Sequence, residues 1–312
     1  MRSCEARAAR RTTDGRMQSR TRPTTERRGP PVFTKKGYNW LRTDPASEAT
    51  EQLEREGYAV LRGVLTPEEV AELHTAASDV YDAFEADVRN AGLPEDERED
   101  FRYEMFNRNA AIQEVVGHPA ILGTIDPLLG EDCHIIANTC WRNPPRETNR
   151  QGGGSWHIDA GPHVPHDLAI PWDDRIPYPV FAIGTHIFLE DCPLESGPTG
   201  VIPGSHKSGT PPPLDRAQDM DLTCYDRGVL ALTAKAGDVA FFVSDMWHRR
   251  LPSGPGDTGR FFIQVHYARR DIAQRVRPTA EVNHVSDEAL ARATSDREKH
   301  LIGIHPRGFY DG

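Results

Sequence analysis

Residues 152–159 read GGGSWHID, and the rest of the chain is organised around this stretch. Residues two apart in a strand point to the same face, so His157 and Asp159 can bind one divalent metal ion. A His-x-Asp triplet by itself is more often a solvated loop pair. The glycines and Trp156 before it, the turn-rich residues 160–162 after it, and a matching segment downstream favour a metal site.

The downstream segment begins with Gly237-Asp238, continues as an apolar run and reaches His248. A carboxylate and two imidazoles form the facial triad of non-heme Fe(II) oxygenases, which leaves the other face of the metal open. His248 is the candidate for the second imidazole, and only a fold that unites distant segments can bring it to Asp159. His163 and His166 are rivals, but their Gly/Pro-rich loop shows no strand pattern.

Beyond Gly130 the chain consists of short β-prone runs separated by Gly, Pro and Asn. Such runs, with no helices alternating between them, favour an antiparallel double-stranded β-helix over a parallel α/β sheet. This jelly-roll, cupin-like core would bring distant segments to one metal. The expected strands are 134–139, 155–158, 180–189, 200–202, 229–233, 239–243 and 260–267.

Helical patterns precede these strands. Residues 47–57 predict a short helix, and residues 58–61 predict a strand. Thr66 and the Pro-Glu-Glu that follows it predict the start of an amphipathic helix that runs to about Arg89. Another helical stretch covers residues 110–129. We expect these helices to support the sheet, which gives a mainly β fold with flanking helices.

Charge is divided unevenly along the chain. Residues 1–42 hold 12 Lys/Arg and 3 Asp/Glu, which leaves 25 and 44 for the remainder. An acidic body argues against nucleic-acid binding and favours a neutral or cationic small-molecule substrate. Residues 1–36 have few large apolar side chains and are expected to be a disordered basic extension, followed by a single domain over 37–312. An upstream start preceding Met17 explains this extension about as well as any function does.

The five cysteines form no CxxC pair and no regular spacing, so neither a zinc ribbon nor a disulfide framework is indicated. No apolar run approaches the roughly 18 to 20 residues that cross a bilayer. These features predict a cytoplasmic protein with reduced thiols and no membrane association. A homodimer is compatible with the sequence, which does not determine the oligomeric state.

Arg260 opens the last clear strand, among Phe and Ile residues that shield it from water. A planar guanidinium can bind a carboxylate through two hydrogen bonds. Arg260 is therefore the candidate anchor for the far carboxylate of 2-oxoglutarate. Arg269 and Arg270 are expected to be ordinary surface charges.

Taken together, these motifs resemble the phytanoyl-CoA dioxygenase family of Fe(II)/2-oxoglutarate oxygenases, over about residues 58–267. The motifs that carry the resemblance are His157-x-Asp159, SGPTGVIPGSHK at 196–207, Gly237-Asp238, Trp247-His248 and Arg260. The resemblance implies that His157, Asp159 and His248 bind Fe(II) and that Arg260 holds 2-oxoglutarate, with O₂ as the other cosubstrate.

The resemblance also suggests roles for two residues on predicted strands. Asn138 falls where some relatives hold the cosubstrate with an amide. His186 occupies a pocket-facing position where a relative has an aromatic residue, so it is a candidate for substrate or cosubstrate contact, with a plain wall residue as the alternative. Several members have a small hydroxyl two residues after the distal histidine, whereas this chain has Arg250 there.

Two loop residues are further candidates for substrate contact. His206 lies in a Pro-Gly-Ser-His turn and is more simply a residue that holds this turn by hydrogen bonds, although its place near the mouth allows contact with substrate. Trp172 lies in the loop 161–179, whose length suits a lid. The acids of this loop could meet a cationic substrate such as an amino sugar, and an ordinary solvated loop is the simpler interpretation.

The sequence therefore predicts an Fe(II)/2-oxoglutarate-dependent dioxygenase that hydroxylates, or oxidatively cyclises, a C–H bond of a small molecule. Secondary metabolism, such as antibiotic or amino-sugar biosynthesis, is the expected setting. Asp159 favours hydroxylation, because halogenating relatives lack this carboxylate. The alternatives are an acyl-CoA 2-hydroxylase, for which no obvious basic patch would take the CoA phosphates, a non-catalytic cupin-like protein that binds metal or ligand, and a zinc hydrolase active without oxygen.

Overall fold

The computed structural model describes residues 46–83, 101–145, 154–274 and 285–305. The strands are β1 (Tyr58–Leu61), β2 (Phe101–Tyr103), β3 (His134–Asn143), β4 (Ala182–Phe188), β5 (Thr199–Val201), β6 (Leu230–Ala231), β7 (Val239–Val243), β8 (His248–Arg250) and β9 (Arg260–Ala268). The α-helices are α1 (Glu48–Glu56), α2 (Pro67–Ala83), α3 (Met105–Arg108), α4 (Ala110–Val115), α5 (Pro119–Leu129), α6 (Asp287–Arg292) and α7 (Asp296–Leu301).

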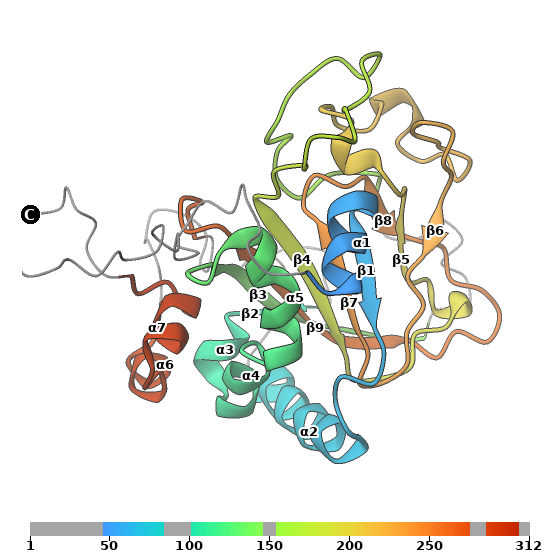
Figure 1. The fold of residues 1–312 in the computed structure, drawn as a ribbon. Helices are drawn as coiled ribbons and strands as arrows, with labels where there is room; N and C mark the ends of the chain where they lie inside the picture. The colour runs from blue at the N-terminus through green and yellow to red at the C-terminus, as the bar shows by residue number, and fades with distance from the viewer. Residues whose placement is uncertain (1–45, 84–100, 146–153, 275–284, 306–312) are drawn as a thin grey trace, which may run out of the picture. The chain divides into compact units, whose positions relative to one another are not determined.

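The strands form two antiparallel sheets (Figure 1). Six strands lie in the order β1-β7-β4-β9-β3-β2, and three lie in the order β6-β5-β8. Val201 of β5 packs in one apolar cluster with Phe242 of β7 and Phe262 of β9, so the two sheets share an interior. The predicted mainly β fold with flanking helices is confirmed.

Strand alternation divides the side chains of β9 between the two faces of the larger sheet. Residues 261, 263, 265 and 267 belong to the main apolar core, together with side chains from α2 to α7. Phe262 packs instead toward the smaller sheet. Because successive strand residues point to opposite faces, Arg260, Gln264 and His266 lie on the same inner face as Phe262. This face carries the polar groups of the site.

The N-terminal helix α1 has the ends that its sequence predicts. The Ser47 side chain accepts a hydrogen bond from the Thr50 backbone N–H, which caps the first turn. Gly57 ends the helix with φ 83°, a left-handed conformation that glycine adopts without strain. A Cβ at Gly57 would lie 2.4 Å from Nδ1 of His206, so only glycine fits between the helix end and this histidine.

Several predicted elements differ in the structure. The helix predicted over 110–129 is divided into α4 and α5, because Pro119 begins a new helix whose N-cap is His118. The strand predicted over 155–158 is wrong, since only His157 forms an isolated bridge there. Strands β2 and β8 and helices α3, α6 and α7 were not predicted. The basic extension 1–36 and the predicted helix end near Arg89 lie outside the described residues.

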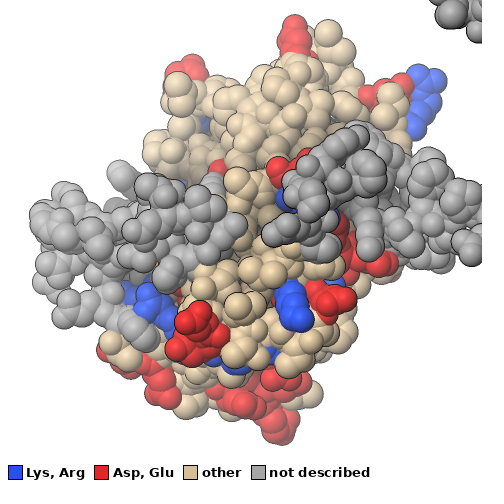
Figure 2. Space-filling view, turned by 90° about the vertical axis from the view of Figure 1, so that its left-hand side faces the viewer, with Lys and Arg blue, Asp and Glu red and all other residues tan. Residues whose placement is uncertain are grey.

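The surface in view is acidic. Figure 2 shows red clusters of Asp and Glu over the lower part of this face, with few Lys or Arg side chains between them.

In the part of the chain that the structure describes, no helix is both long and apolar enough to cross a bilayer. Cys133, Cys140, Cys192 and Cys224 are buried free thiols, as their irregular spacing predicted.

Candidate metal centre

The three predicted metal ligands converge at one point. His157, Asp159 and His248 each present one ligand atom, and these atoms all lie within 4.8 Å of one another. Nε2 of His248 lies 3.5 Å from Oδ1 of Asp159, and Nε2 of His157 lies 3.8 Å from the same oxygen. Such distances suit three ligands on one side of an ion, each bound at about 2 Å.

Backbone pairing brings these distant segments together. His157 and His248 each donate their N–H to the other's carbonyl oxygen at 3.0 Å, which forms a two-bond antiparallel bridge. The Asp159 N–H donates to the carbonyl oxygen of Ser244 at 3.0 Å. Residues 157–159 thus lie against the connection from β7 to β8, although they are not part of a regular strand.

The two imidazoles have the tautomer that metal binding needs. Nδ1 of His157 lies 2.8 Å from the carbonyl oxygen of Ser155, and Nδ1 of His248 lies 2.9 Å from that of Met246. A carbonyl oxygen only accepts, so each ring carries its proton on Nδ1 and keeps a lone pair on Nε2. Both lone pairs face Asp159, and the residues therefore fit a metal ion.

The charges at this point also suit a cation. Burial raises the pKa of Asp159, but His248 and His266 beside it outweigh burial and hold this pKa below its usual range. Burial lowers the pKa of His157, and the adjacent His248 lowers it further. For His248, burial lowers the pKa, but the Asp159 carboxylate reverses this and raises it. A metal ion would take the place of the proton that Asp159 stabilises on His248.

Arg260 is a buried cation whose hydrogen-bond acceptors are neutral. Two of its guanidinium nitrogens donate to Oδ1 of Asn143 at 3.2 and 2.7 Å, and a third donates to the carbonyl oxygen of Gly197 at 3.0 Å. Burial, together with the nearby charge of Arg250, lowers the pKa of Arg260 to about 9. Within the described residues no carboxylate forms an ion pair with it, so an anionic ligand would supply the missing charge.

Asn138 lies on the opposite face of the larger sheet from these groups. It pairs in register with Val265, a residue of the main core. Its Oδ1 accepts from the Phe106 N–H at 2.8 Å, and its Nδ2 donates to the Gln264 carbonyl oxygen at 3.0 Å. Its amide therefore holds α3 against β3 and β9, which corrects the expectation that it contacts the cosubstrate.

His186 lies on the inner face, as a pocket-facing residue should. It is buried, with its ring centre 4.5 Å from that of Phe262 and 5.3 Å from that of Phe242. Nδ1 lies 3.5 Å from the hydroxyl oxygen of Thr199. Burial lowers the pKa of His186 well below its usual value, and the charge of Arg260 lowers it further. His186 is thus a neutral imidazole in the interior that contains the metal ligands and Arg260.

The rival histidines are used elsewhere. His163 donates its backbone N–H to Oδ2 of Asp245 at 2.9 Å, and its Nδ1 lies 2.5 Å from Oδ1 of the same carboxylate. Nδ1 of His166 lies 3.0 Å from the carbonyl oxygen of Val164. Neither belongs to the metal-ligand group.

Asp245 forms hydrogen bonds with both ends of the loop 161–179. Besides His163 near the start of the loop, it accepts a hydrogen bond at 3.3 Å from the hydroxyl of Tyr178 near the end. The side chain of Asp245 is buried, so both ends of the loop are fixed to the segment that precedes His248.

The Asp245→Ala protein is therefore expected to open this loop more often. Loss of three hydrogen bonds, at about 1 kcal/mol each, would raise the open population roughly a hundredfold. Amide hydrogen exchange in peptides covering 161–179 measures this change. Asp173→Ala removes only an exposed pair within the loop and is the matched control. Equal exchange rates in the Asp245→Ala and wild-type proteins would show that the loop is held by other contacts.

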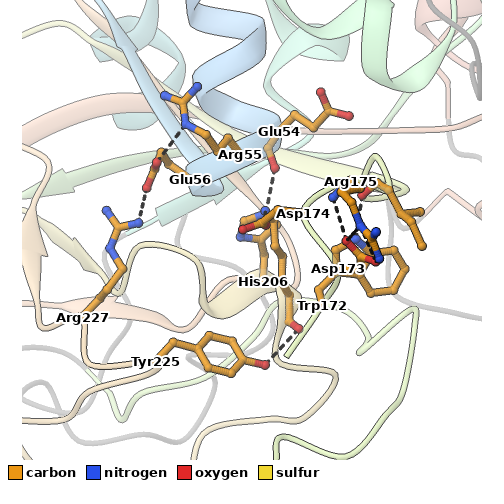
Figure 3. A network of polar contacts seen from close by, with 12 residues as sticks. Glu54, Arg55, Glu56, Trp172, Asp173, Asp174, Arg175, His206, Tyr225 and Arg227 are labelled. Carbon is orange, nitrogen blue, oxygen red and sulfur yellow. Dashed lines mark hydrogen bonds and ion pairs between the residues drawn. The ribbon is translucent and has the colours of Figure 1, made fainter. Parts of the chain in front are cut away.

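The other two loop candidates have structural partners (Figure 3). Nε2 of His206 lies 3.0 Å from the carbonyl oxygen of Glu54, so it ties its turn to the end of α1. Burial lowers the pKa of His206 to about 3, which keeps it neutral. Trp172 donates its Nε1–H to the carbonyl oxygen of Ile176 and packs edge-on against Tyr178 with ring centres 5.1 Å apart. Both side chains thus have structural roles.

Two inner residues of β9 were missed as site residues. Nδ1 of His266 lies 3.6 Å from Oδ2 of Asp159, and Gln264 contacts His266 through its side-chain amide. They lie four and six residues after Arg260, and this even spacing was the available signal, because it places all three on one face of a strand. A hollow of about 630 Å³ bounded by α2, α4, α5 and α7 includes none of the three metal ligands in its lining.

Comparison with known proteins identifies relatives of this chain. The family model for phytanoyl-CoA dioxygenase (PhyH) matches residues 53–253. The ectoine dioxygenase of Nocardia farcinica is 25% identical over 235 residues, which are 65% of this chain and 71% of that protein.

Solved structures share the fold. EctD from S. alaskensis, solved with 2-oxoglutarate and 5-hydroxyectoine, has a TM-score of 0.57 at 20% identity, and the match covers 81% of this chain and 88% of that chain. SnoK, a non-heme alpha-ketoglutarate-dependent carbocyclase from nogalamycin biosynthesis, has a TM-score of 0.55 at 21% identity, covering 76% of this chain and 88% of that one.

Proposed function

Because the chain belongs to the phytanoyl-CoA dioxygenase family and is a non-heme iron, 2-oxoglutarate-dependent dioxygenase, we propose that it oxidises a C–H bond of a small molecule in secondary metabolism. Hydroxylation is the proposed outcome, with oxidative cyclisation as a variant. The observation that carries this proposal is the carboxylate of Asp159 beside the two imidazoles, because it leaves no ligand position on this side for a halide.

Each residue of the site has a part in this proposal. His157, Asp159 and His248 would hold Fe(II), and Arg260 would bind the far carboxylate of 2-oxoglutarate. Bound iron supplies oxidation by O₂ coupled to the conversion of 2-oxoglutarate to succinate and CO₂. His186 would form a neutral, apolar-backed wall beside the cosubstrate. We interpret the two sheets that share this interior as a double-stranded β-helix.

A neutral substrate fits the lid loop better than a cationic amino sugar. Two of its three acids are already paired with cations, since Asp173 pairs with Arg175 (Figure 3) and Asp174 pairs with Lys207. The third, Asp167, accepts a hydrogen bond from the Ala169 N–H. Among the known relatives, one is named as an ectoine dioxygenase and SnoK is named as a carbocyclase from nogalamycin biosynthesis, which supports oxidation of a small molecule without identifying it.

An acyl-CoA substrate is the less favoured alternative. Three phosphate groups of CoA would need free cations near the mouth. In the loop 161–179 and in the connection 202–229 between β5 and β6, Lys207, Arg175 and Arg216 form ion pairs with aspartates, and Arg227 pairs with Glu56. These two segments therefore offer the phosphates no ready basic patch. A group of unpaired Lys or Arg side chains would favour CoA, and the described residues of these loops do not include one.

Succinate formation tests the proposal. The full chain, supplied with Fe(II), 2-oxoglutarate and O₂, is expected to release succinate slowly alone and faster with an oxidisable small molecule from a substrate panel. Omission of O₂ should stop this release. A binding protein without catalytic function would form no succinate with any ligand, and a zinc hydrolase would act without O₂. Either result would contradict the proposal.

A further inference from the structure

A line of polar side chains continues from the metal ligands along the inner side of β9 and β3. It runs from Asp159 through His266 and Gln264 to Thr139 and Trp141. The residues beyond Asp159 are neither metal ligands nor part of the Arg260 contacts. Their hydrogen-bond directions can be derived, because one end of the line is a group that only donates.

That end is the indole of Trp141. Its Nε1–H donates to the side-chain oxygen of Gln264 at 2.7 Å, and the Thr139 hydroxyl donates to the same oxygen at 3.1 Å. An indole N–H cannot accept, so the Gln264 amide must present its oxygen on this side and its NH₂ group on the other. The amide orientation is therefore fixed by the network.

The NH₂ group of Gln264 lies 2.8 Å from Nε2 of His266. Since the amide nitrogen only donates, Nε2 of His266 must accept. A neutral imidazole that accepts at Nε2 carries its proton on Nδ1. His266 thus presents an N–H toward Oδ2 of Asp159, at a distance of 3.6 Å.

The two oxygens of Asp159 have different surroundings. Oδ1 faces the imidazoles of His157 and His248, at 3.8 and 3.5 Å. Oδ2 is buried and makes no hydrogen bond to any described residue. A buried carboxylate oxygen without a donor is costly, and a movement of under about 1 Å would bring it into hydrogen-bond range of His266.

We propose that His266 is a positioning residue, whose Nδ1–H holds Oδ2 of Asp159 so that Oδ1 alone binds the metal. Gln264, held by Trp141 and Thr139, sets the tautomer that makes this possible. The inference rests on the proposed iron site. A carboxylate bound through one oxygen leaves three positions for the two cosubstrate oxygens and O₂, whereas binding through both oxygens would occupy one of them.

Two nearly isosteric variants separate a hydrogen-bonding role from a packing role. His266→Leu removes the donor, while His266→Asn keeps an amide N–H near the position of Nδ1. Groups that orient metal ligands contribute roughly 10- to 100-fold to metal affinity. We expect anaerobic Fe(II) titration to show this loss for His266→Leu, and affinity within about threefold of wild type for His266→Asn. His134→Gln, which alters a buried histidine on β3 that bonds to His305 and Ile272, is expected to leave the affinity unchanged.

Circular dichroism and thermal unfolding of the metal-free proteins establish that each variant is folded. Equal Fe(II) affinity in the Leu and Asn variants would overturn the assignment, whether both match wild type or both are weakened. If His266→Leu does not fold, Gln264→Leu replaces it, because loss of the amide frees the tautomer and should also weaken Fe(II) binding. Unchanged affinity in that variant would again overturn the assignment. Failure of the wild-type chain to bind Fe(II) would instead refute the proposed function.

Discussion

The His248→Ala protein is expected to fold but to bind Fe(II) at least about a hundredfold more weakly, and to lose 2-oxoglutarate turnover. A structural zinc site with four ligands binds its metal with about 10–16 kcal/mol, or about 3 kcal/mol per ligand. A similar loss is expected here, and 1.4 kcal/mol is a factor of about ten in affinity. His157→Ala should have the same effect for the same reason. Anaerobic Fe(II) titration, followed by a succinate assay, measures both losses.

His163→Ala is the control for this experiment. His163 is a nearby histidine that the structure pairs with Asp245 rather than with the ligand group. Its removal should loosen the loop and leave Fe(II) affinity intact. The opposite pattern, with iron lost from His163→Ala and kept by His248→Ala, would refute the choice of ligands.

The Arg260→Ala protein is expected to need far more 2-oxoglutarate, while its affinity for Fe(II) stays close to wild type. Truncation of one partner in a buried, hydrogen-bonded charge pair costs about 2–5 kcal/mol, or roughly 30-fold to several thousand-fold in affinity. The 2-oxoglutarate dependence of succinate release, measured at saturating Fe(II), gives the change in KM. The KM of the Arg260→Lys protein should lie between those of the wild-type and Arg260→Ala proteins, because lysine keeps the charge but not the planar guanidinium group.

Arg269→Gln is the matched control. Arg269 is also buried and follows the end of β9, but it forms an ion pair with Asp271 at 3.0 Å and so has its own countercharge. Its substitution should leave the KM for 2-oxoglutarate unchanged. An unaltered KM in Arg260→Ala would remove the anchor role from Arg260.

The sequence predicted the ligand group because chemistry limits it more strongly than secondary structure does. His157 and Asp159 were chosen for their spacing in an expected strand, and the structure replaces that strand with a single bridge to His248. The same two residues still converge with His248, because the backbone hydrogen bonds between His157 and His248 hold them there without a regular strand. The family resemblance, the enzyme class and the cofactors are confirmed, whereas substrate roles for His206 and Trp172 stay predictions.

The site residues that the sequence did not predict correctly are those whose role depends on which face of a strand they occupy. Asn138 was assigned to the cosubstrate, but the register of β3 against β9 turns it toward α3. Residues 137–143 pair with β9 in one continuous register, so alternation from Asn143, which pairs with Arg260, places Asn138 on the opposite face. His266 was missed because its partner, Asp159, lies on a distant segment and only the fold brings the two together.

A crystal structure of the full chain, grown without oxygen in the presence of Fe(II) and 2-oxoglutarate, tests the central claim most directly. We predict one iron bound by Nε2 of His157, Oδ1 of Asp159 and Nε2 of His248, with the far carboxylate of 2-oxoglutarate on Arg260. Iron bound elsewhere, or a 2-oxoglutarate molecule that does not contact Arg260, would contradict this account.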